Sequence, residues 1–341
     1  MTRGLLLALA VSAVACGDDD LPPLTDATEL RCPTPGDLPF RLDTRGFAND
    51  TNATVGTQRT RDKSEASDTL GNPSGPSANV YLDDAIASES SLAYRGAKGR
   101  TMENNGLFAT PLPDERVSLW TYTADDWIAV GETTTDANGT YALPMDMTVA
   151  NGQPVYAMLE ADGSCAEHYV QLLPRGAKVV ITDIDGTLTT DDNELLMQIG
   201  DASYVPKMKG AAVEMVRAWA DKGYPIVYMT ARSHVFRVET RGWLRDQGFP
   251  FGAVITANSL GDADGYKTAW GMRMLDTFGW VPVAAYGNAT TDISAYDNAG
   301  IPKDITFIIG EHAGSEGTVA IANDDYASHI DAFIRAQPDN P

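Results

Sequence analysis

Asp183 and Asp185 are the residues whose type and spacing point most clearly to chemistry. They end the run Val179-Val-Ile-Thr-Asp183-Ile-Asp185-Gly186-Thr187, in which an apolar, β-branched stretch gives way to two carboxylates. Such a stretch is typical of a parallel strand buried on both faces, and open α/β sheets bind ligands beyond the carboxyl ends of their strands. Two carboxylates this close repel each other unless a metal ion or a shared proton neutralises them. The pair therefore indicates a reactive site more than a packing feature.

Polar motifs also follow three later β-prone runs. They are Thr230-Ala-Arg232-Ser-His234 after the run 225–229, Gly265-Tyr-Lys267 after the run 253–255, and Gly287-Asn288-Ala-Thr-Thr291-Asp292 after the run 283–286. A parallel sheet gathers the ends of its strands at one edge, so we expect these motifs to converge with the first. Oxygen ligands suit Mg²⁺, which takes few of them from the protein and keeps several waters. A lysine and a hydroxyl complete a clamp for phosphate, so the set predicts phosphoryl transfer.

The second half of the chain alternates between the two periodicities. Helical patterns at 210–220, 235–247, 268–275 and 325–336 separate β-prone runs at 225–229, 253–255, 283–286 and 306–309. This alternation predicts helices packed on a parallel sheet. We therefore predict an α/β fold, a doubly wound, Rossmann-like domain, over residues 175–337.

The motifs, in this order, resemble those of the haloacid dehalogenase superfamily of aspartate-nucleophile phosphatases. Over about residues 178–335 the chain is most similar to the lipin-type phosphatidate phosphatase domain, which also occurs at the C-terminus of phosphatidylinositol transfer proteins of the retinal-degeneration-B type. The resemblance is carried by Asp183-Ile-Asp-Gly-Thr-Leu-Thr, Tyr228-Met-Thr-Ala-Arg232, Phe249-Pro-Phe-Gly252 and Gly287-Asn288…Asp292-Ile-Ser-Ala-Tyr296…Gly300-Ile-Pro302. It implies a haloacid dehalogenase domain with a minimal cap, because only residues 188–209 separate the first strand from the next helix.

The resemblance also implies a role for each motif residue. Asp183 is expected to be the nucleophile, forming an aspartyl-phosphate, and Asp185 the general acid and then the base. Thr230, Arg232 and Lys267 are expected to bind the substrate phosphate. Mg²⁺ is expected to be held by Asp183, the main-chain carbonyl of Asp185, Asp292 and, as a further contributor, Asn288.

Several of these residues have a second interpretation that the sequence leaves open. Thr187 either caps the turn or acts directly, and Lys267 could be a surface lysine of a helix. Arg232 either binds substrate or pairs with Asp292. Asp297 is either a salt-bridge partner or a supporting acid of the site. His234 is expected to be structural, and His312, in a loop, is a less favoured candidate for a residue of the site.

Residues 76–174 show short alternating runs that predict a small all-β sandwich, and the segment around residues 133–143 resembles immunoglobulin-like domains, which implies an immunoglobulin-like sandwich. Val117–Tyr122 alternates at period two, and residues 133–143 carry the turn signal Asp136-Ala-Asn138-Gly139 between two β-prone flanks, which predicts a hairpin. The acidic residues of this predicted sandwich do not have the spacing of metal ligands. Asp68–Pro73, just upstream, weakly resembles what precedes the domain in the transfer proteins.

Residues 1–16 have the pattern of a targeting segment. Arg3 precedes a short apolar stretch, and small residues lead to Cys16, which resembles the lipidation site of a bacterial lipoprotein signal; the alternative is an ordinary secretory signal. Both predict export, to the cell envelope (periplasm or outer membrane) with Cys16 lipidated, or otherwise secreted. Residues 17–75 are polar and predict a tether. In an oxidising compartment Cys32 and Cys165 are a possible disulfide, or else two unpaired thiols.

The composition of the chain argues against one class of function, the binding of nucleic acids. The net charge of −22 argues against a nucleic-acid partner, which needs a basic face. We expect an exported Mg²⁺-dependent phosphatase acting on a phosphomonoester, with phosphatidate the leading substrate and a lipid anchor holding it at the membrane. Two alternatives stay open: a non-catalytic module that binds phosphatidate or phosphoinositide, and a phosphatase of broad specificity for soluble organic phosphates.

Overall fold

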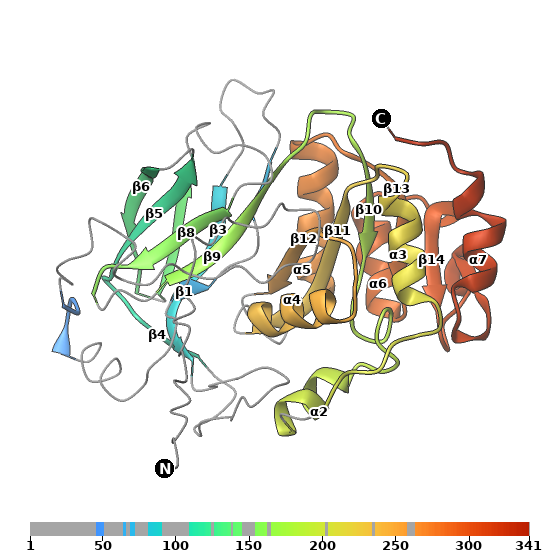
Figure 1. Ribbon diagram of the computed structural model, residues 1–341, viewed down its shortest axis with the longest axis horizontal. Coiled ribbons are helices and arrows are strands. Elements are labelled where there is room, and N and C mark those ends of the chain that lie inside the picture. Colours follow the sequence, from blue (N-terminus) through green and yellow to red (C-terminus); the bar gives the residue numbers. More distant parts are fainter. Residues whose placement is uncertain are drawn as a thin grey trace, which may run out of the picture.

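A computed structural model describes most of the chain beyond residue 45. The described residues are 46–50, 64–65, 69–71, 81–90, 109–123, 126–137, 139–144, 154–161, 165–201, 204–233, 236–257 and 263–340. Two small β-sheets made from the first part of the chain lie beside a larger α/β unit (Figure 1). This confirms the predicted fold class, an α/β domain preceded by β-structure.

The α/β unit is built on a six-stranded sheet in which every pairing is parallel. The strands are β10 (Lys178–Thr182), β11 (Ile226–Ser233), β12 (Ala253–Ala257), β13 (Val281–Gly287), β14 (Thr306–Ile309) and β15 (Val319–Ile321). Their order is β12-β11-β10-β13-β14-β15. The chain therefore moves outward in one direction from β10 to β12 and in the other from β13 to β15. This order places a topological switch point between β10 and β13, where such sheets bind ligands.

Helices cover both faces of this sheet because its strands alternate apolar side chains to both sides. The helices are α2 (Glu194–Gly200), α3 (Ala212–Ala220), α4 (Arg237–Asp246), α5 (Ala263–Met272), α6 (Thr290–Asn298) and α7 (Ala327–Ala332). Val180 of β10 belongs to a core cluster with residues of α3, α4 and α7. Its neighbours Val179 and Ile181 belong to a second cluster with residues of α5 and α6. The two clusters make a three-layer α/β/α unit.

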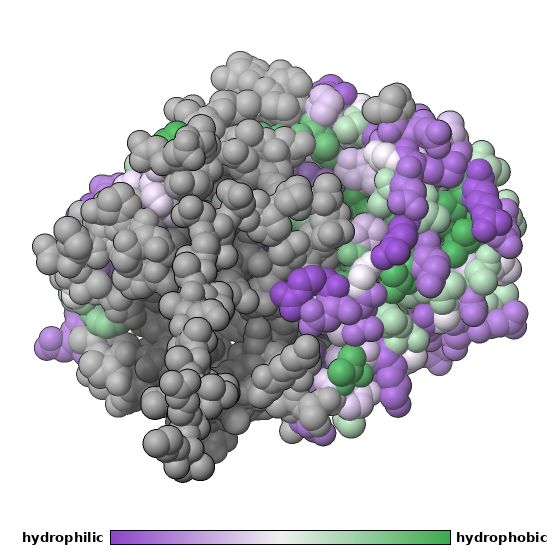
Figure 2. Space-filling view, viewed as in Figure 1, coloured by the Kyte–Doolittle hydropathy of each residue, from purple (hydrophilic) through white to green (hydrophobic). Residues whose placement is uncertain are grey.

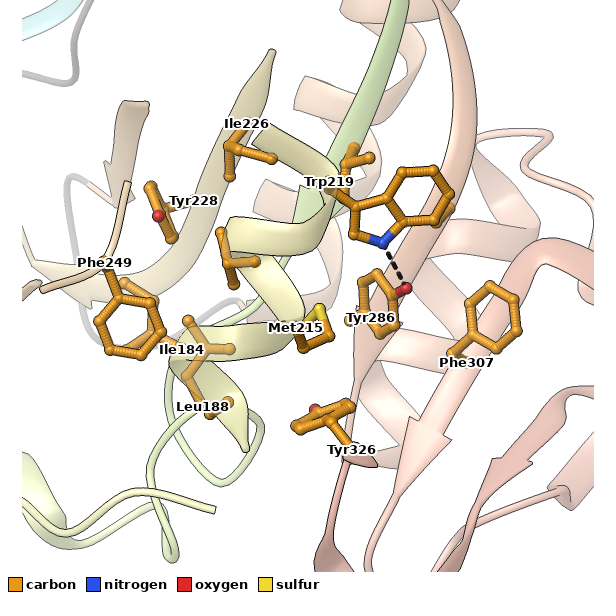
Figure 3. Packing of buried hydrophobic residues seen from close by; sticks show 14 of the residues in the cluster. Ile184, Leu188, Met215, Trp219, Ile226, Tyr228, Phe249, Tyr286, Phe307 and Tyr326 are labelled. Atoms are coloured by element: carbon orange, nitrogen blue, oxygen red, sulfur yellow. Dashed lines mark hydrogen bonds between the residues drawn. The ribbon is translucent and has the colours of Figure 1, made fainter. Parts of the chain in front are cut away.

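A hydrogen-bonded chain of aromatic side chains crosses the first cluster. The Trp219 indole donates to the Tyr286 hydroxyl at 2.7 Å (Figure 3). That hydroxyl lies 2.9 Å from Nε2 of His329. Because the indole can only donate, the hydroxyl accepts from it and is left to donate its own proton to a neutral imidazole. Phe307 and Phe333 pack against the His329 ring, at centroid distances of 4.4 and 5.2 Å. Burial lowers the pKa of His329 to about 4.

The upstream strands form two sheets that share one core. The strands are β1 (Ser64–Glu65), β2 (Thr69–Gly71), β3 (Tyr81–Ser90), β4 (Ala109–Pro111), β5 (Arg116–Thr123), β6 (Asp126–Thr134), β7 (Thr140–Pro144), β8 (Pro154–Leu159) and β9 (Cys165–Leu172). One sheet joins β1, β3, β4 and β7, and the other has the order β2-β9-β8-β5-β6. Tyr141 of β7 packs in one cluster with Val117 and Leu119 of β5 and Val155 of β8. All pairs are antiparallel except β2 with β9.

The hairpin predicted across residues 133–143 is wrong. The turn forms, with Gly139 N donating to Asp136 O at 2.9 Å, but β6 pairs with β5 and β7 pairs with β3 of the other sheet. Buried Thr135 directly follows β6, and its hydroxyl donates to Leu112 O and accepts from Glu115 N. The chain is thereby tied to the start of β5 and passes between the sheets. Instead, β5 and β6 form the hairpin.

Several elements of the α/β unit lie beyond what periodicity predicted. Helices α2 and α6 and the short strand β15 were not expected, and α5 begins at Ala263 and continues into a π-helical turn, Arg273–Thr277. The sequence of α6 has a weak apolar stripe, in which Ile293, Ala295 and Tyr296 are buried. Three-residue β15 is too short to show a period. Strand β11 extends to Ser233, so Thr230 and Arg232 belong to the strand.

The predicted targeting segment, the lipidation site Cys16 and the disulfide partner Cys32 lie outside the described residues. Cys165 begins β9. Among the residues that the structure describes, no helix has the length and apolar character needed to cross a membrane. On the face shown in Figure 2, the α/β unit presents mainly hydrophilic side chains with smaller apolar patches between them.

The partly buried imidazole of His329 predicts that part of the folding stability depends on pH. Because the pKa of His329 falls from 6.5 when unfolded to about 4 when folded, the unfolded chain binds the extra proton first as the pH falls. The contribution is therefore complete above pH 6.5 and is lost progressively below it. Because the His329 imidazole is partly exposed, we expect the free energy of unfolding to fall by only about 1 kcal/mol between pH 7.5 and pH 5.

Urea unfolding at both pH values measures this loss. His329→Gln keeps an acceptor for the Tyr286 hydroxyl and should lose less stability on acidification than the wild type. His312→Gln, which changes an imidazole beside Glu311 in a surface loop, serves as the control. An unchanged pH slope in His329→Gln would contradict the assignment.

Candidate active site

Lys267 joins the two most deeply buried acids at the switch point. Its Nζ lies 2.6 Å from Oδ1 of Asp183 and 2.6 Å from Oδ1 of Asp292. Asp183 directly follows β10, Lys267 lies inside α5 and Asp292 lies in the first turn of α6. The three side chains are at most 5 % exposed. The surface-lysine interpretation of Lys267 is therefore wrong.

Main-chain N–H groups position the Asp292 carboxylate in addition to its ion pair with Lys267. Its Oδ2 accepts from the main-chain N–H of Asn288 at 2.9 Å and of Ala289 at 3.0 Å, which caps the start of α6. Gly287 permits this approach, because a Cβ there would lie 2.5 Å from Cβ of Asp292. Residue 287 must therefore be glycine for the carboxylate to lie at the sheet edge.

The charges of this group do not balance. Two carboxylates face one ammonium, which leaves a net negative charge in a buried place. Burial raises the pKa of Asp183 to about 7, against the attraction of Lys267 and with help from Asp292 and Asp185. Burial lowers the pKa of Lys267, but the two carboxylates outweigh it and the net pKa is raised. The lysine stays protonated, and the excess charge rests on the acids.

A second ion pair holds Asp185 separately. Arg232 donates to it from Nε, at 2.9 Å to Oδ2 and 3.1 Å to Oδ1, and from Nη2, at 2.7 Å to Oδ1. The Thr230 hydroxyl donates to Oδ2 at 3.0 Å. Thr230 and Arg232 are two residues apart on β11 and so project to one side of it. Thr240 of α4 accepts from Arg232 NH1 at 3.0 Å and fixes the guanidinium from behind. The alternative in which Arg232 pairs with Asp292 is wrong.

Thr187, Asn288 and Asp192 form a polar row next to Asp183. The Thr187 hydroxyl lies 2.9 Å from Oδ2 of Asp183 and 3.0 Å from Oδ1 of Asn288, so its single proton is shared between them. Asn288 Nδ2 donates to Oδ1 of Asp192 at 3.1 Å. Thr187 therefore contacts the Asp183 carboxylate directly. Sequence reasoning missed Asp192, although it lies only nine positions after Asp183.

Gly186 lets this row close against the first motif. Its φ is +67°, a left-handed conformation that favours glycine. A Cβ at this position would overlap Nδ2 of Asn288 and Oδ1 of Asp192. Any side chain at residue 186 would therefore separate the loop from Asn288.

The donor set suits a hard cation such as Mg²⁺. Within the part of the chain that the structure describes, no three His, Cys, Asp or Glu side chains form a ready metal centre. Asp183 and Asp292 nevertheless place two buried acids against one ammonium, and the Asn288 amide oxygen is joined to Asp183 through Thr187. Carboxylate and amide oxygens with few protein ligands are what Mg²⁺ prefers.

Other candidates lie elsewhere. Asp297 pairs with Lys303 at 3.4 Å and is 58 % exposed, so it is a surface partner and not an acid of the site. His312 pairs with Glu311 in a surface loop. His234 lies outside the described residues.

Comparison with known proteins places the site within a recognised domain. Residues 180–310 match the family model of the LNS2 domain of PITM 1-3. The chain is 29 % identical over 212 residues to the protein retinal degeneration B of Drosophila melanogaster, covering 61 % of this chain and 16 % of that protein. It is 28 % identical over 271 residues to the membrane-associated phosphatidylinositol transfer protein 3 of Mus musculus, covering 77 % of this chain and 27 % of that protein.

The chain thus spans under a third of the length of these curated relatives. The 271-residue match is longer than residues 178–340, so the similarity extends into the β-rich part. Among solved structures, the D,D-heptose 1.7-bisphosphate phosphatase of B. bronchiseptica, complexed with magnesium and phosphate, aligns with a TM-score of 0.33 and 15 % identity. That alignment covers 47 % of this chain and 99 % of the other.

Gly186→Ala tests how closely the loop packs on Asn288. A left-handed alanine alone costs about 1 to 2 kcal/mol, and overlap with Asn288 and Asp192 should raise the total to roughly 3 kcal/mol. Gly317→Ala is the matched control, because its φ of +83° is similar and nothing lies within 4 Å of the added Cβ. Chemical unfolding of both variants measures the difference. Equal losses of stability would show that residue 186 does not pack against Asn288.

Proposed function

Since residues 180–310 of this chain are an LNS2 domain with a haloacid dehalogenase-like fold, we propose that the chain is a Mg²⁺-dependent phosphatase that hydrolyses a phosphomonoester through an aspartyl-phosphate on Asp183. The observation that carries this proposal is the buried group of Asp183, Lys267 and Asp292 at the switch point of the sheet. A carboxylate that is buried, ion-paired and next to a second acid is typical of an active site more than of a stabilising pair.

In the first half of the reaction, a carboxylate oxygen of Asp183 forms a bond to phosphorus while the bond to the leaving oxygen breaks. Lys267 neutralises charge on the nucleophile and the incoming phosphate, and the Thr187 hydroxyl holds Oδ2 of Asp183 in place. Asp185, as the general acid, gives a proton to the leaving oxygen. The products are the alcohol and an acyl phosphate on Asp183.

In the second half, water attacks the phosphorus of the aspartyl-phosphate. Asp185, now a carboxylate, takes a proton from that water, the bond from phosphorus to the Asp183 oxygen breaks, and inorganic phosphate leaves. Arg232 and Thr230 orient Asp185 through four hydrogen bonds, so they act on the proton shuttle. A substrate-binding role for these two residues remains a prediction of the sequence.

Mg²⁺ would be held by Asp183, Asp292, Asn288 and the main-chain carbonyl of Asp185, where it would neutralise the phosphate and polarise its oxygens. In its absence, burial leaves the pKa of Asp183 at about 7, so part of the nucleophile is protonated at neutral pH. A divalent cation beside it would favour the ionised, nucleophilic form.

We further propose that the substrate is a lipid phosphate, with phosphatidate the leading candidate. Of the six large hydrophobic side chains that are exposed among the described residues, Leu196, Met197 and Val205 lie on α2 or just after it. This segment, which lies below the sheet in Figure 1, begins two residues after Asp192, the residue bonded to Asn288. We call Leu196, Met197 and Val205 the apolar rim. Exposed apolar side chains near a phosphate site suit a substrate whose phosphate headgroup is attached to acyl chains. Export and an anchor at Cys16, both still predictions, would hold the enzyme near such a substrate.

Replacing the nucleophile tests the chemistry. Asp183→Asn should reduce Mg²⁺-dependent release of phosphate from p-nitrophenyl phosphate and from phosphatidate by at least about 10³-fold, because an amide does not form the acyl phosphate. Asp297→Asn makes the same chemical change at a surface acid and should retain wild-type turnover. Turnover that survives in Asp183→Asn would refute the assignment. Phosphatidate binding without turnover in the wild type would favour the non-catalytic module.

The apolar rim is tested by comparing substrates. The double variant Leu196→Asp/Met197→Asp should lose at least about tenfold in turnover of phosphatidate in vesicles, since two exposed apolar side chains no longer enter the lipid surface. Turnover of soluble p-nitrophenyl phosphate should not change. Met272→Asp, at a position 45 % exposed at the end of α5, is the control. Equal losses on both substrates, or no loss on vesicles, would favour a soluble phosphate as the substrate.

A further inference from the structure

We propose that Asp192 is a positioning residue that fixes the orientation of the Asn288 amide, so that its oxygen and not its NH2 group faces the nucleophile and the cation. This inference rests on the proposed cation site. The relevant contacts are at the two ends of one amide: Oδ1 of Asn288 lies 3.0 Å from the Thr187 hydroxyl, and Nδ2 lies 3.1 Å from Oδ1 of Asp192.

An asparagine side chain has no intrinsic preference for either orientation. Its oxygen accepts and its NH2 donates, and a half-turn about the last bond exchanges them. The Thr187 hydroxyl has one proton for two acceptors, Asp183 and Asn288, and an oxygen that can also accept, so Thr187 alone does not fix the orientation of the amide. An ionised carboxylate only accepts, so Asp192 selects the orientation in which NH2 points toward it. The amide oxygen is then directed toward Thr187 and Asp183, where a cation needs an acceptor.

The surroundings of Asp192 also indicate a role beyond solvation. Partial desolvation of this otherwise exposed side chain, together with Asp185, Asp191 and Asp292, raises the pKa of Asp192, while the bond from Asn288 opposes the rise. An acid is therefore held next to other acids, where its charge is unfavourable. Gly186 removes the Cβ that would otherwise separate Asp192 and Asn288 from the loop.

Asp192 contacts the end of the amide opposite to the one that contacts Thr187. It therefore acts through Asn288, as the outer partners of metal ligands commonly do when they fix a ligand's orientation. Loss of such a partner typically weakens metal affinity by about 10- to 100-fold.

The test is a double-mutant cycle read out by Mg²⁺ binding to the full chain, measured by isothermal titration calorimetry without substrate. Asp192→Asn should weaken Mg²⁺ binding by at least about tenfold, because the amide introduced by this change can both donate and accept and so no longer dictates the orientation of Asn288. In the Asn288→Asp background the same change should matter little, within about threefold, because a carboxylate presents oxygen at both ends. Thermal unfolding confirms that each variant is folded.

The outcomes separate this inference from its premise. If Asp192→Asn binds Mg²⁺ as tightly as the wild type, Asp192 has no positioning role, and the phosphatase proposal is unaffected. If it weakens binding by the same factor in both backgrounds, Asp192 acts as a direct ligand or by its charge, and the inference is overturned. If the wild type does not bind Mg²⁺, both this inference and the cation site of the proposed function fail.

Discussion

The ion pair of Lys267 with Asp183 and Asp292 is the interaction on which the site depends. One ammonium brings together the end of β10, the middle of α5 and the start of α6, at distances of 2.6 Å to each acid. Buried charges of this kind are costly unless they are fully paired. Here two acids share one base, so the arrangement retains an unfavourable charge. Such a charge is understandable where a cation and a phosphate are to bind.

The rest of the site is arranged around that group by small residues and by a second, separate ion pair. Gly186 and Gly287 leave room for Asn288 and Asp292 to approach the first motif. Arg232, fixed by Thr240, holds Asp185 apart from Lys267. The two acids of the first motif therefore have different partners. Different surroundings suit the two roles that we propose for them, nucleophile and proton shuttle.

Pairing between distant strands is where prediction from local pattern failed. Period-two alternation identified β-structure on both sides of the Asp136–Gly139 turn, but the flanks belong to different sheets. The decisive contact is Thr135 with Leu112 and Glu115, residues about 20 positions earlier. Local sequence does not encode contacts of this span.

By itself, the sequence determined the α/β fold class, the order of the motifs and their meeting at one sheet edge, because periodicity and the position of polar residues after strands are local properties. Only the tertiary structure decided which basic side chain pairs with which acid: Lys267 bridges Asp183 and Asp292, whereas Arg232 pairs with Asp185. It also brought Asp192 to Asn288, 96 residues away. These pairings depend on strand register and on how closely loops approach, and both are set by packing across the whole domain.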